Sequence, residues 1–188
     1  MERCEWAGSN ENMQEYHDTV WGVPEYDDQR LFRKLVLDMN QAGLSWQTIL
    51  NKMENFDQAY EHFVLEKVAA FDEAKVESLM QDAGIIRNRR KIEAAITNAQ
   101  KVLDMQASGL SFSDYLWGFV DHQVIDEKRA SMADVPAKTE LSDAIAKDLK
   151  KRGFKFVGST TIYAFLQAVG IVNDHKITCF RYEELSKK

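Results

Sequence analysis

Two cysteines and two histidines near the ends of the chain are of the residue types that bind metal ions. Cys4 and His17 lie close to the start, and His175 and Cys179 lie close to the end, four positions apart. That spacing places the last two side chains on one side of a helical turn or a tight loop. Two thiolates and two imidazoles form a donor set that zinc prefers, and a site with four protein ligands is structural. Two buried free thiols with two ordinary histidines fit the spacing equally well, whereas a disulfide is disfavoured in a reducing compartment.

Four aromatic side chains are concentrated in the first quarter of the chain. Trp6, Tyr16, Trp21 and Trp46 have the flat faces on which an extruded nucleobase stacks. Asp38 follows the apolar face of a predicted helix, where a carboxylate beside aromatic rings would meet a cationic purine. Core packing is the more common role for any single ring, and a helix cap or a surface acid explains Asp38 about as well.

A helix, a short turn and a second helix are predicted around Gly84. We expect Gly84 to take a positive φ and Ile85 and Ile86 to anchor the turn in the core. The free backbone N–H groups at the start of the second helix form a natural phosphate site. Four basic residues surround that site: Arg87, Arg89, Arg90 and Lys91. Such a hairpin grips a phosphodiester backbone without reading bases; a solvated basic helix end is the alternative.

Helical periodicity runs through most of the chain and predicts an all-α fold. Helix starts are expected at Asp27 or Asp28, Ser45, Asp72, Asn88, Ser113, Ser142 and Ser159. Glycines at 84, 153 and 170 follow helical runs and are expected to end them. Residues 124–139 are the least patterned and are interpreted as a connection between two helical halves. No alternating strand is predicted.

Length and composition predict one domain over residues 1–188. The chain has 188 residues, 45% of them hydrophobic, which suffices for a sizeable core. No apolar stretch approaches the ~20 residues of a membrane span, so a cytoplasmic protein is expected, and nothing indicates more than a monomer. The formal charge of -6 argues against a nucleic-acid partner unless basic residues cluster on one face. A second basic run contributes Lys147, Lys150, Lys151, Arg152 and Lys155.

From end to end, the chain resembles the 3-methyladenine DNA glycosylase I family. The matching segments occur in the same order and are Met1–Trp6, Tyr16–Asp18, Trp21–Pro24, Gln41–Trp46, Asp82–Arg87, Arg152–Gly158 and Val172–His175, with Cys179. The resemblance implies a helix-hairpin-helix fold with the hairpin at about residues 73–107. It also implies one structural zinc ion joining the terminal segments 1–20 and 170–182. The zinc ligands would be Cys4, His17, His175 and Cys179.

The same resemblance implies an activity and a set of roles. Family members hydrolyse the N-glycosidic bond of 3-methyladenine in double-stranded DNA and leave an abasic site. The resemblance assigns contact with the methylated base to Asp38, stacking to Trp46 and a polar contact to Tyr16. Supporting positions in the base pocket fall to Trp6, Trp21 and Met13. Contacts to the DNA backbone fall to Gly84, Ile86, Arg87, Arg89 and Lys91. No lysine is recognisable from the sequence as a Schiff-base nucleophile, so a monofunctional hydrolase is expected.

Departures from the family pattern fall mainly in the pocket. Asp38 stands where the family usually carries glutamate, and Met39 and Asn40 replace glycine and glutamine. Met13 stands where some members have tyrosine. Outside the pocket, Arg90 and Ser159 also differ from the family. In one interpretation Asp38 still meets the purine. In the other, the shorter side chain of Asp38 does not reach the purine and Met39 intrudes into the pocket. A misplacement of ~1 Å can cost about 100-fold in rate. The result would be a protein that binds damaged or abasic DNA with altered or lost excision. A helical interaction protein that uses the aromatic pocket for a partner is a third possibility.

Overall fold

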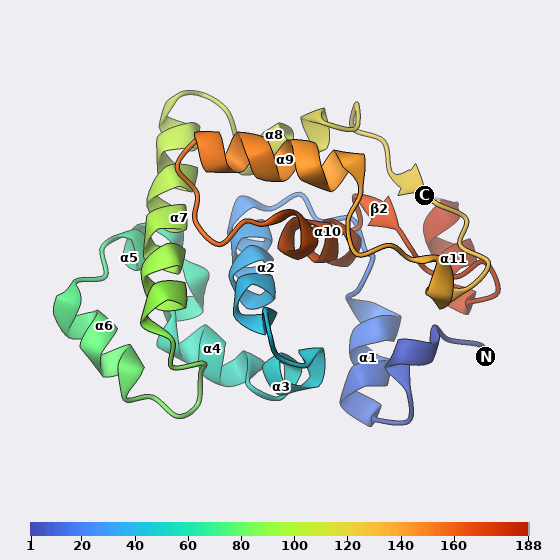
Figure 1. Cartoon of the computed structure of the whole chain (residues 1–188), viewed down its shortest axis with the longest axis horizontal. Coiled ribbons are helices and arrows are strands. Elements are labelled where there is room, and N and C mark those ends of the chain that lie inside the picture. Colours follow the sequence, from blue (N-terminus) through green and yellow to red (C-terminus); the bar gives the residue numbers. More distant parts are fainter. Residues whose placement is uncertain (188) are drawn as a thin grey trace.

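The computed structural model describes residues 1–187 and is almost entirely helical, as predicted (Figure 1). In chain order the elements are η1 (Glu5–Ala7), α1 (Glu11–Thr19), α2 (Asp28–Gln41), α3 (Trp46–Asn51), α4 (Met53–Ala59), η2 (Glu61–Phe63), α5 (Leu65–Ala69), α6 (Glu73–Met80), α7 (Arg89–Ala107), α8 (Phe112–Gly118), β1 (Ile125–Asp126), η3 (Met132–Asp134), α9 (Glu140–Lys151), α10 (Ser159–Ala168), β2 (Val172–Asn173) and α11 (Phe180–Ser186). None of these helices is long and apolar enough to cross a membrane.

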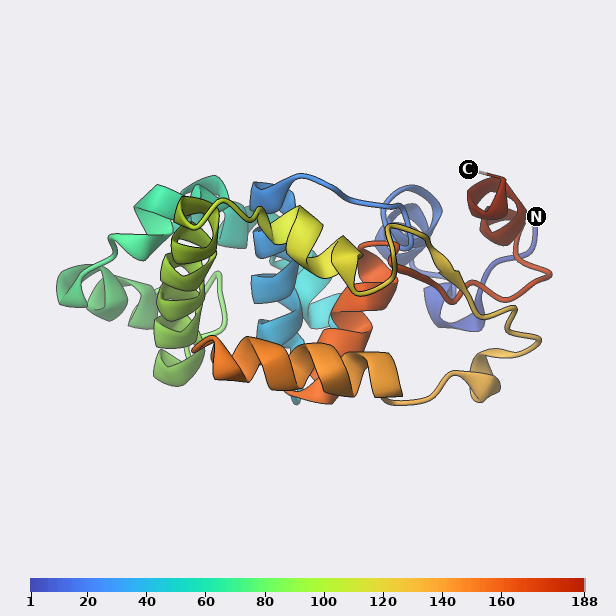
Figure 2. The ribbon, with the colours of Figure 1, turned by 90° about the horizontal axis from the view of Figure 1, so that it is seen from above.

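Helix α2 runs through the middle of the molecule and packs against α3, α7, α8 and α10 (Figure 1). Its residues Leu31, Phe32, Leu35 and Val36 are fully buried, so the core surrounds this helix on several sides. Helices α4 to α7 lie at one end of the molecule. Helix α1, helix α11 and both termini lie at the other end, where the two ends of the chain come together in both views (Figure 2).

Side-chain caps begin many of the helices where the sequence predicts them. Asp27, Ser45, Asp72 and Asn88 each accept a hydrogen bond from a backbone N–H in the first helical turn. The start of α10 at Ser159 is also as predicted, and two other starts differ. Ser111, not Ser113, caps α8, because the N–H groups of Phe112 and Ser113 are taken by Asp28 from α2. Thr139 caps α9 in a reciprocal pair with Ser142, and α10 begins at Ser159 after an N-cap glycine, Gly158.

The helix–turn–helix segment falls at the predicted place, but its glycine acts differently. Helix α6 ends at Met80, four residues before Gly84, and Gly84 does not adopt a positive φ. A Cβ at Gly84 would lie 3.1 Å from Cβ of Asn55, a tight contact, so the glycine favours close packing of the turn against α4. Ile85 is buried in the core and Ile86 is partly buried, as expected for anchors of the turn.

One short strand pairing was not predicted. Ile125 of β1 lies beside Val172 of β2 in a parallel ladder of two residues. Two residues are too few to produce an alternating pattern, so the sequence contains no signal for them. The pairing attaches the connection at residues 124–139 to the segment that leads to His175.

Candidate functional site

A cavity of about 280 Å³ lies between α1, α2, α3 and α10. It is lined by Trp6, Met13, Tyr16, Trp21, Lys34, Asp38, Gln41, Trp46, Met132, Ala164, Gln167 and Ala168. All six residues that the sequence analysis assigned to the base or to catalysis therefore line one space. The volume lies just below the ~300–1,000 Å³ of pockets for drug-sized ligands, which suits a single small ring system.

The aromatic walls of the cavity are held by contacts among themselves. The ring centroids of Tyr16 and Trp46 are 5.2 Å apart, and those of Trp6 and Trp21 are 5.1 Å apart. Within the described residues, the Trp6 and Trp46 indole N–H groups and the Tyr16 hydroxyl are buried without a hydrogen-bond partner. Buried polar atoms are rarely left unpaired in native proteins, so these three groups indicate a site for a polar aromatic ligand.

Asp38 enters the cavity from α2. It is 4% exposed, and its Oδ1 lies 3.5 Å from the Lys34 ammonium. Its second carboxylate oxygen, Oδ2, has no hydrogen-bond partner among residues 1–187. Burial raises the pKa of Asp38 to about 6, against the opposing effect of Lys34. The carboxylate thus has one oxygen without a hydrogen-bond partner and is still ionised at neutral pH.

Lys34, one helical turn before Asp38, is a charged residue of the cavity that the sequence analysis missed. Its ammonium lies 3.6 Å from the centre of the Trp46 ring and 5.0 Å from that of Tyr16. Burial lowers the pKa of Lys34 to about 8, and the Asp38 carboxylate limits the change. The available signal was the i,i+4 spacing of a lysine and an aspartate on an otherwise apolar helix face.

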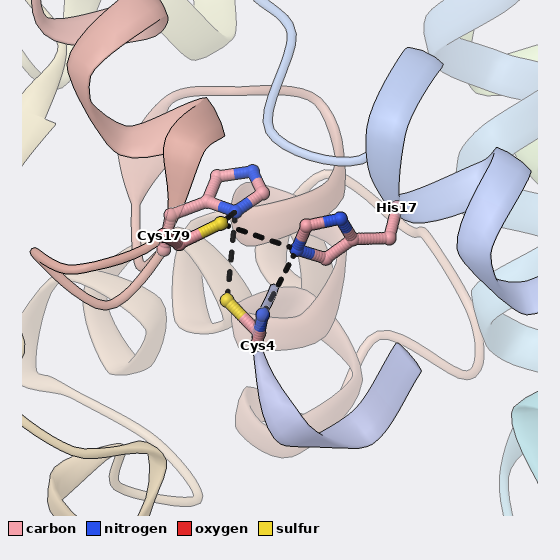
Figure 3. Close-up of side chains that lie close together, drawn as sticks. Cys4, His17 and Cys179 are labelled. Carbon is pink, nitrogen blue, oxygen red and sulfur yellow. Dashed lines mark hydrogen bonds between the residues drawn. The ribbon is translucent and has the colours of Figure 1, made fainter. Parts of the chain in front are cut away.

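The four predicted metal ligands lie together at the end of the molecule where the termini lie, and Figure 3 shows Cys4, His17 and Cys179 pointing toward one another. Cys4, His17, His175 and Cys179 are fully buried, and their ligand atoms lie within 4.8 Å of one another. Cys179 Sγ lies 3.5 Å from His17 Nε2 and 3.6 Å from His175 Nδ1, and Cys4 Sγ lies 3.6 Å from His175 Nδ1. A tetrahedral zinc with its usual bond lengths requires sulfur–nitrogen separations of about 3.5 Å. The donor set and its spacing therefore fit zinc.

Further contacts orient these ligands and join them to the cavity. His17 Nδ1 lies 2.8 Å from the Asp18 carboxylate, which also accepts hydrogen bonds from Arg3. His175 Nε2 lies 3.1 Å from the Trp21 carbonyl oxygen, and the Trp21 ring packs edge-on against His175. Such outer contacts are typical of metal-binding histidines. The cluster thus sets the position of a cavity wall.

Neither cysteine forms a disulfide, and the two thiols differ in acidity. Hydrogen bonds from Cys4, His17 and His175 lower the pKa of Cys179. The hydrogen bond to Cys179, together with burial, raises the pKa of Cys4. A bound cation would favour the thiolate form of both cysteines.

Comparisons with known proteins agree over nearly the whole chain. The family model described as Methyladenine glycosylase matches residues 6–182. The chain belongs to the methyladenine glycosylase family. It is 49% identical to the DNA-3-methyladenine glycosylase 1 of Escherichia coli (strain K12) over 97% of each chain, and 45% identical to the DNA-3-methyladenine glycosylase of Haemophilus influenzae over 94% of this chain and 96% of that one.

Solved structures extend the agreement to the fold. A crystal structure of 3-methyladenine DNA glycosylase I (TAG) superposes with a TM-score of 0.93 at 49% identity, covering 95% of this chain and 98% of that one. The Staphylococcus aureus protein in a structure on 3-methyladenine recognition matches with a TM-score of 0.91 at 38% identity, over 96% of each chain. This member of the methyladenine glycosylase family is accordingly an enzyme of the DNA glycosylase type.

Met39 and Asn40 do not narrow the cavity of this methyladenine glycosylase. Met39 is fully buried in the core, with its sulfur 3.2 Å from the Asn98 amide nitrogen of α7. The Asn40 amide donates a hydrogen bond to the carbonyl of Val36, one turn earlier in α2. Neither residue lines the cavity, so the structure does not support the alternative interpretation in which Met39 intrudes. Helix geometry is the reason, because Met39 and Asp38 point about 100° apart around α2.

The basic residues at the hairpin differ in what their charges contact. Lys91 is not free to bind phosphate, because it is buried and its amine donates to the carbonyls of Asn40 and Ala42 at 2.8 and 3.0 Å. The assignment of Lys91 to the DNA backbone is therefore wrong, and this lysine instead holds the end of α2. Arg89 forms ion pairs with Glu73, Glu77 and Glu93.

Arg87 and Arg90 are exposed at the start of α7. Arg90 lies 5.7 Å from the ring centre of Phe156, and these two residues line a surface groove with Lys155. The fold thus brings the hairpin next to one residue of the second basic run. The backbone roles of Gly84, Ile86, Arg87 and Arg89 stay predictions.

Proposed function

We propose that this enzyme hydrolyses the N-glycosidic bond of 3-methyladenine in double-stranded DNA, after the nucleotide leaves the duplex and its base enters the aromatic cavity. The observation that carries the proposal is the cavity itself. It combines the stacking faces of Trp46 and Tyr16, unpaired buried N–H and O–H groups, and a free carboxylate oxygen of Asp38. Relatives named DNA-3-methyladenine glycosylase, and neighbours solved in studies of 3-methyladenine recognition, support this choice of base.

The chemistry requires little from the protein beyond binding and charge. Methylation at N3 gives the base a positive charge, so the bond from C1′ to the purine breaks with its electron pair moving onto the base. Positive charge develops on the sugar, and water adds at C1′ and loses a proton. Asp38 would stabilise the cationic base and the developing positive charge on the sugar. Trp46 and Tyr16 would hold the extruded base by stacking.

The supporting parts follow the same proposal. Zinc on Cys4, His17, His175 and Cys179 would have no open position for water, so its role would be to hold the terminal segments and the cavity wall. The hairpin of α6 and α7 would grip the phosphodiester backbone near Gly84, Ile86 and Arg87, with Arg90 and Lys155 beside it. We expect a monomer acting in the cytoplasm.

Base release from methylated DNA tests the proposal. We expect the purified protein to release free 3-methyladenine, detected by chromatography, and Asp38→Asn to reduce the rate strongly without preventing folding. Trp46→Phe, which keeps a stacking face, should retain more activity than Trp46→Ala. Binding to DNA that contains abasic sites, with no release of 3-methyladenine at any pH tested, would contradict excision.

One observation favours the second candidate, a family member with altered lesion preference or lost excision. The Lys34 ammonium pairs with Asp38 and neutralises the charge that would attract a cationic base. The same release assay distinguishes the two candidates when it includes Asp38→Glu. A large gain in 3-methyladenine release by Asp38→Glu would indicate that the natural pocket serves another lesion.

A further inference from the structure

Among residues 1–187, Lys34 and Asp38 are the only lining residues of the cavity that carry a charge. The third titratable group is the Tyr16 hydroxyl, and burial raises its pKa, so it stays neutral. The groups that face the Lys34 ammonium from other elements are the rings of Tyr16 on α1 and Trp46 on α3. At neutral pH the ammonium and the carboxylate cancel, and the cavity has no net charge.

The Lys34 ammonium occupies the stacking platform. At 3.6 Å from the centre of the Trp46 ring, it takes the contact distance that a stacked base would take. No carbonyl or hydroxyl oxygen in the described part of the chain accepts a hydrogen bond from this amine, and Asp38 is its one anionic neighbour. A flexible side chain with so few fixed partners can move aside when a ring enters.

We propose that Lys34 is a specificity-determining residue, because its ammonium competes with a positively charged base for the Trp46 face and the Asp38 carboxylate. The inference rests on the proposed function only in that the cavity takes a purine. A charged base must displace the ammonium or accept repulsion from it, whereas a neutral purine does not. A neutral purine can also accept a hydrogen bond from Lys34 through a ring nitrogen. Lys34 therefore shifts the preference of the cavity away from cationic purines and toward neutral ones.

Binding of two small ligands tests the role of charge without any excision step. The probes are neutral 9-methyladenine and the permanently charged 3,9-dimethyladenine cation, titrated at pH 7 against tryptophan fluorescence. We expect Lys34→Met to raise the affinity for the cation by about tenfold or more, because a repulsive charge at close range is removed. Affinity for 9-methyladenine should change by much less. Lys34 lowers the pKa of Asp38, so in Lys34→Met more of Asp38 is protonated before binding, and entry of the cation should release a proton that is detected as a buffer-dependent binding heat.

Two variants complete the charge series. Lys34→Arg keeps the cation and should keep the weak binding of 3,9-dimethyladenine, and Asp38→Asn leaves the ammonium uncompensated and should weaken it further. The exposed Lys67→Met serves as the surface control and should match the parent protein.

The outcomes separate this inference from the proposed function. If the ratio of the two ligand affinities is the same in the parent and in Lys34→Met, the proposed role of Lys34 is overturned. The proposal that the cavity binds a base would still stand. Absence of 3-methyladenine release, together with the expected shift in the ratio, would overturn excision and support the role of Lys34. Binding of neither ligand to any folded variant would overturn both.

Discussion

Lys34 and Asp38 lie one helical turn apart on α2, and each changes the charge state of the other. Burial acts against both charges, raising the pKa of the acid to about 6 and lowering that of the amine to about 8. Their attraction partly opposes each change. The pair is therefore ionised only in a window around neutral pH. Below that window Asp38 is neutral and the cavity is positive, and above it Lys34 is neutral and the cavity is negative.

The pH dependence of base release follows from these pKa values. Below about pH 6 Asp38 is protonated, and the cavity is positive and repels a cationic base. Above about pH 8 Lys34 is neutral, the cavity is negative, and release of 3-methyladenine should be fastest. We expect single-turnover rates from pH 5 to 9.5 to rise through both values. In Lys34→Met the rise in rate near pH 8 should disappear. If the variant has the same pH–rate profile as the parent, that rise does not come from deprotonation of Lys34.

Stacking on Trp46 makes a second prediction at the level of one residue. Base–aromatic stacking contributes about 1–3 kcal/mol per base when measured by alanine substitution. Trp46→Ala should therefore lower base release by roughly 5-fold to 150-fold. Trp46 also contacts Lys34, so thermal unfolding of the variant is the control for a general loss of structure. Equal activity in Trp46→Ala and the parent would exclude Trp46 as the stacking face.

At the scale of elements, the end of α2 and the start of α7 are joined by a buried lysine. Lys91 donates to two carbonyls at the end of α2, close to the turn that leads to Trp46. Burial lowers the pKa of Lys91, as expected for an amine withdrawn from solvent. The hairpin and the cavity are thereby mechanically linked. Lys91 thus belongs to the core although it lies in a basic segment, whereas Arg87 of the same segment is exposed.

Substitutions of Lys91 and Arg87 should change different properties, the first the stability of the protein and the second the salt dependence of DNA binding. Lys91→Met should lower the free energy of unfolding by about 1–3 kcal/mol, because two main-chain carbonyls lose a charged donor. It should leave the salt dependence of DNA binding unchanged. Arg87→Ala should leave stability unchanged and reduce the slope of log K against log salt by about 1. Urea unfolding and DNA titrations at several salt concentrations check both, and the reverse assignment of effects would contradict this view of the hairpin.

At the scale of the whole molecule, the cysteine and histidine cluster ties the two ends of the chain together beside the cavity. The N-terminal segment carries Trp6, Tyr16 and Trp21, so three cavity walls depend on where that segment is held. Gly22 contributes to this arrangement because its φ is +83°, which favours glycine. A Cβ on Gly22 would lie 2.9 Å from His175 Nε2, too close for a side chain to fit. The aromatic cavity and the cluster of cysteines and histidines are one structural unit.

Metal removal should therefore affect the cavity as well as the fold. We expect one zinc per purified chain. Chelation or Cys179→Ser should lower the Tm by about 10 °C or more. A structural zinc contributes several kcal/mol to the free energy of unfolding, and each 1 kcal/mol shifts the Tm by roughly 2–4 °C in a chain of this size. Tryptophan fluorescence should change together with the Tm. A metal-free protein with the same Tm and the same ligand affinity would contradict the structural role.

The amino-acid sequence alone predicted the helical class, four of the helix caps, the four cysteines and histidines that cluster, and six of the residues that line the aromatic cavity. These features depend on local chemistry or on long motifs that resemble a known family. Only the tertiary structure decided the roles of Lys34, Met39, Gly84 and Lys91. Each of these roles depends on which side chain or backbone from a distant segment lies within a few ångströms, such as Trp46 above Lys34 or Asn55 against Gly84. The roles of Lys34 and Lys91 cannot be read from the sequence, because the fold places the Lys34 ammonium over the Trp46 ring and the Lys91 ammonium against two main-chain carbonyls.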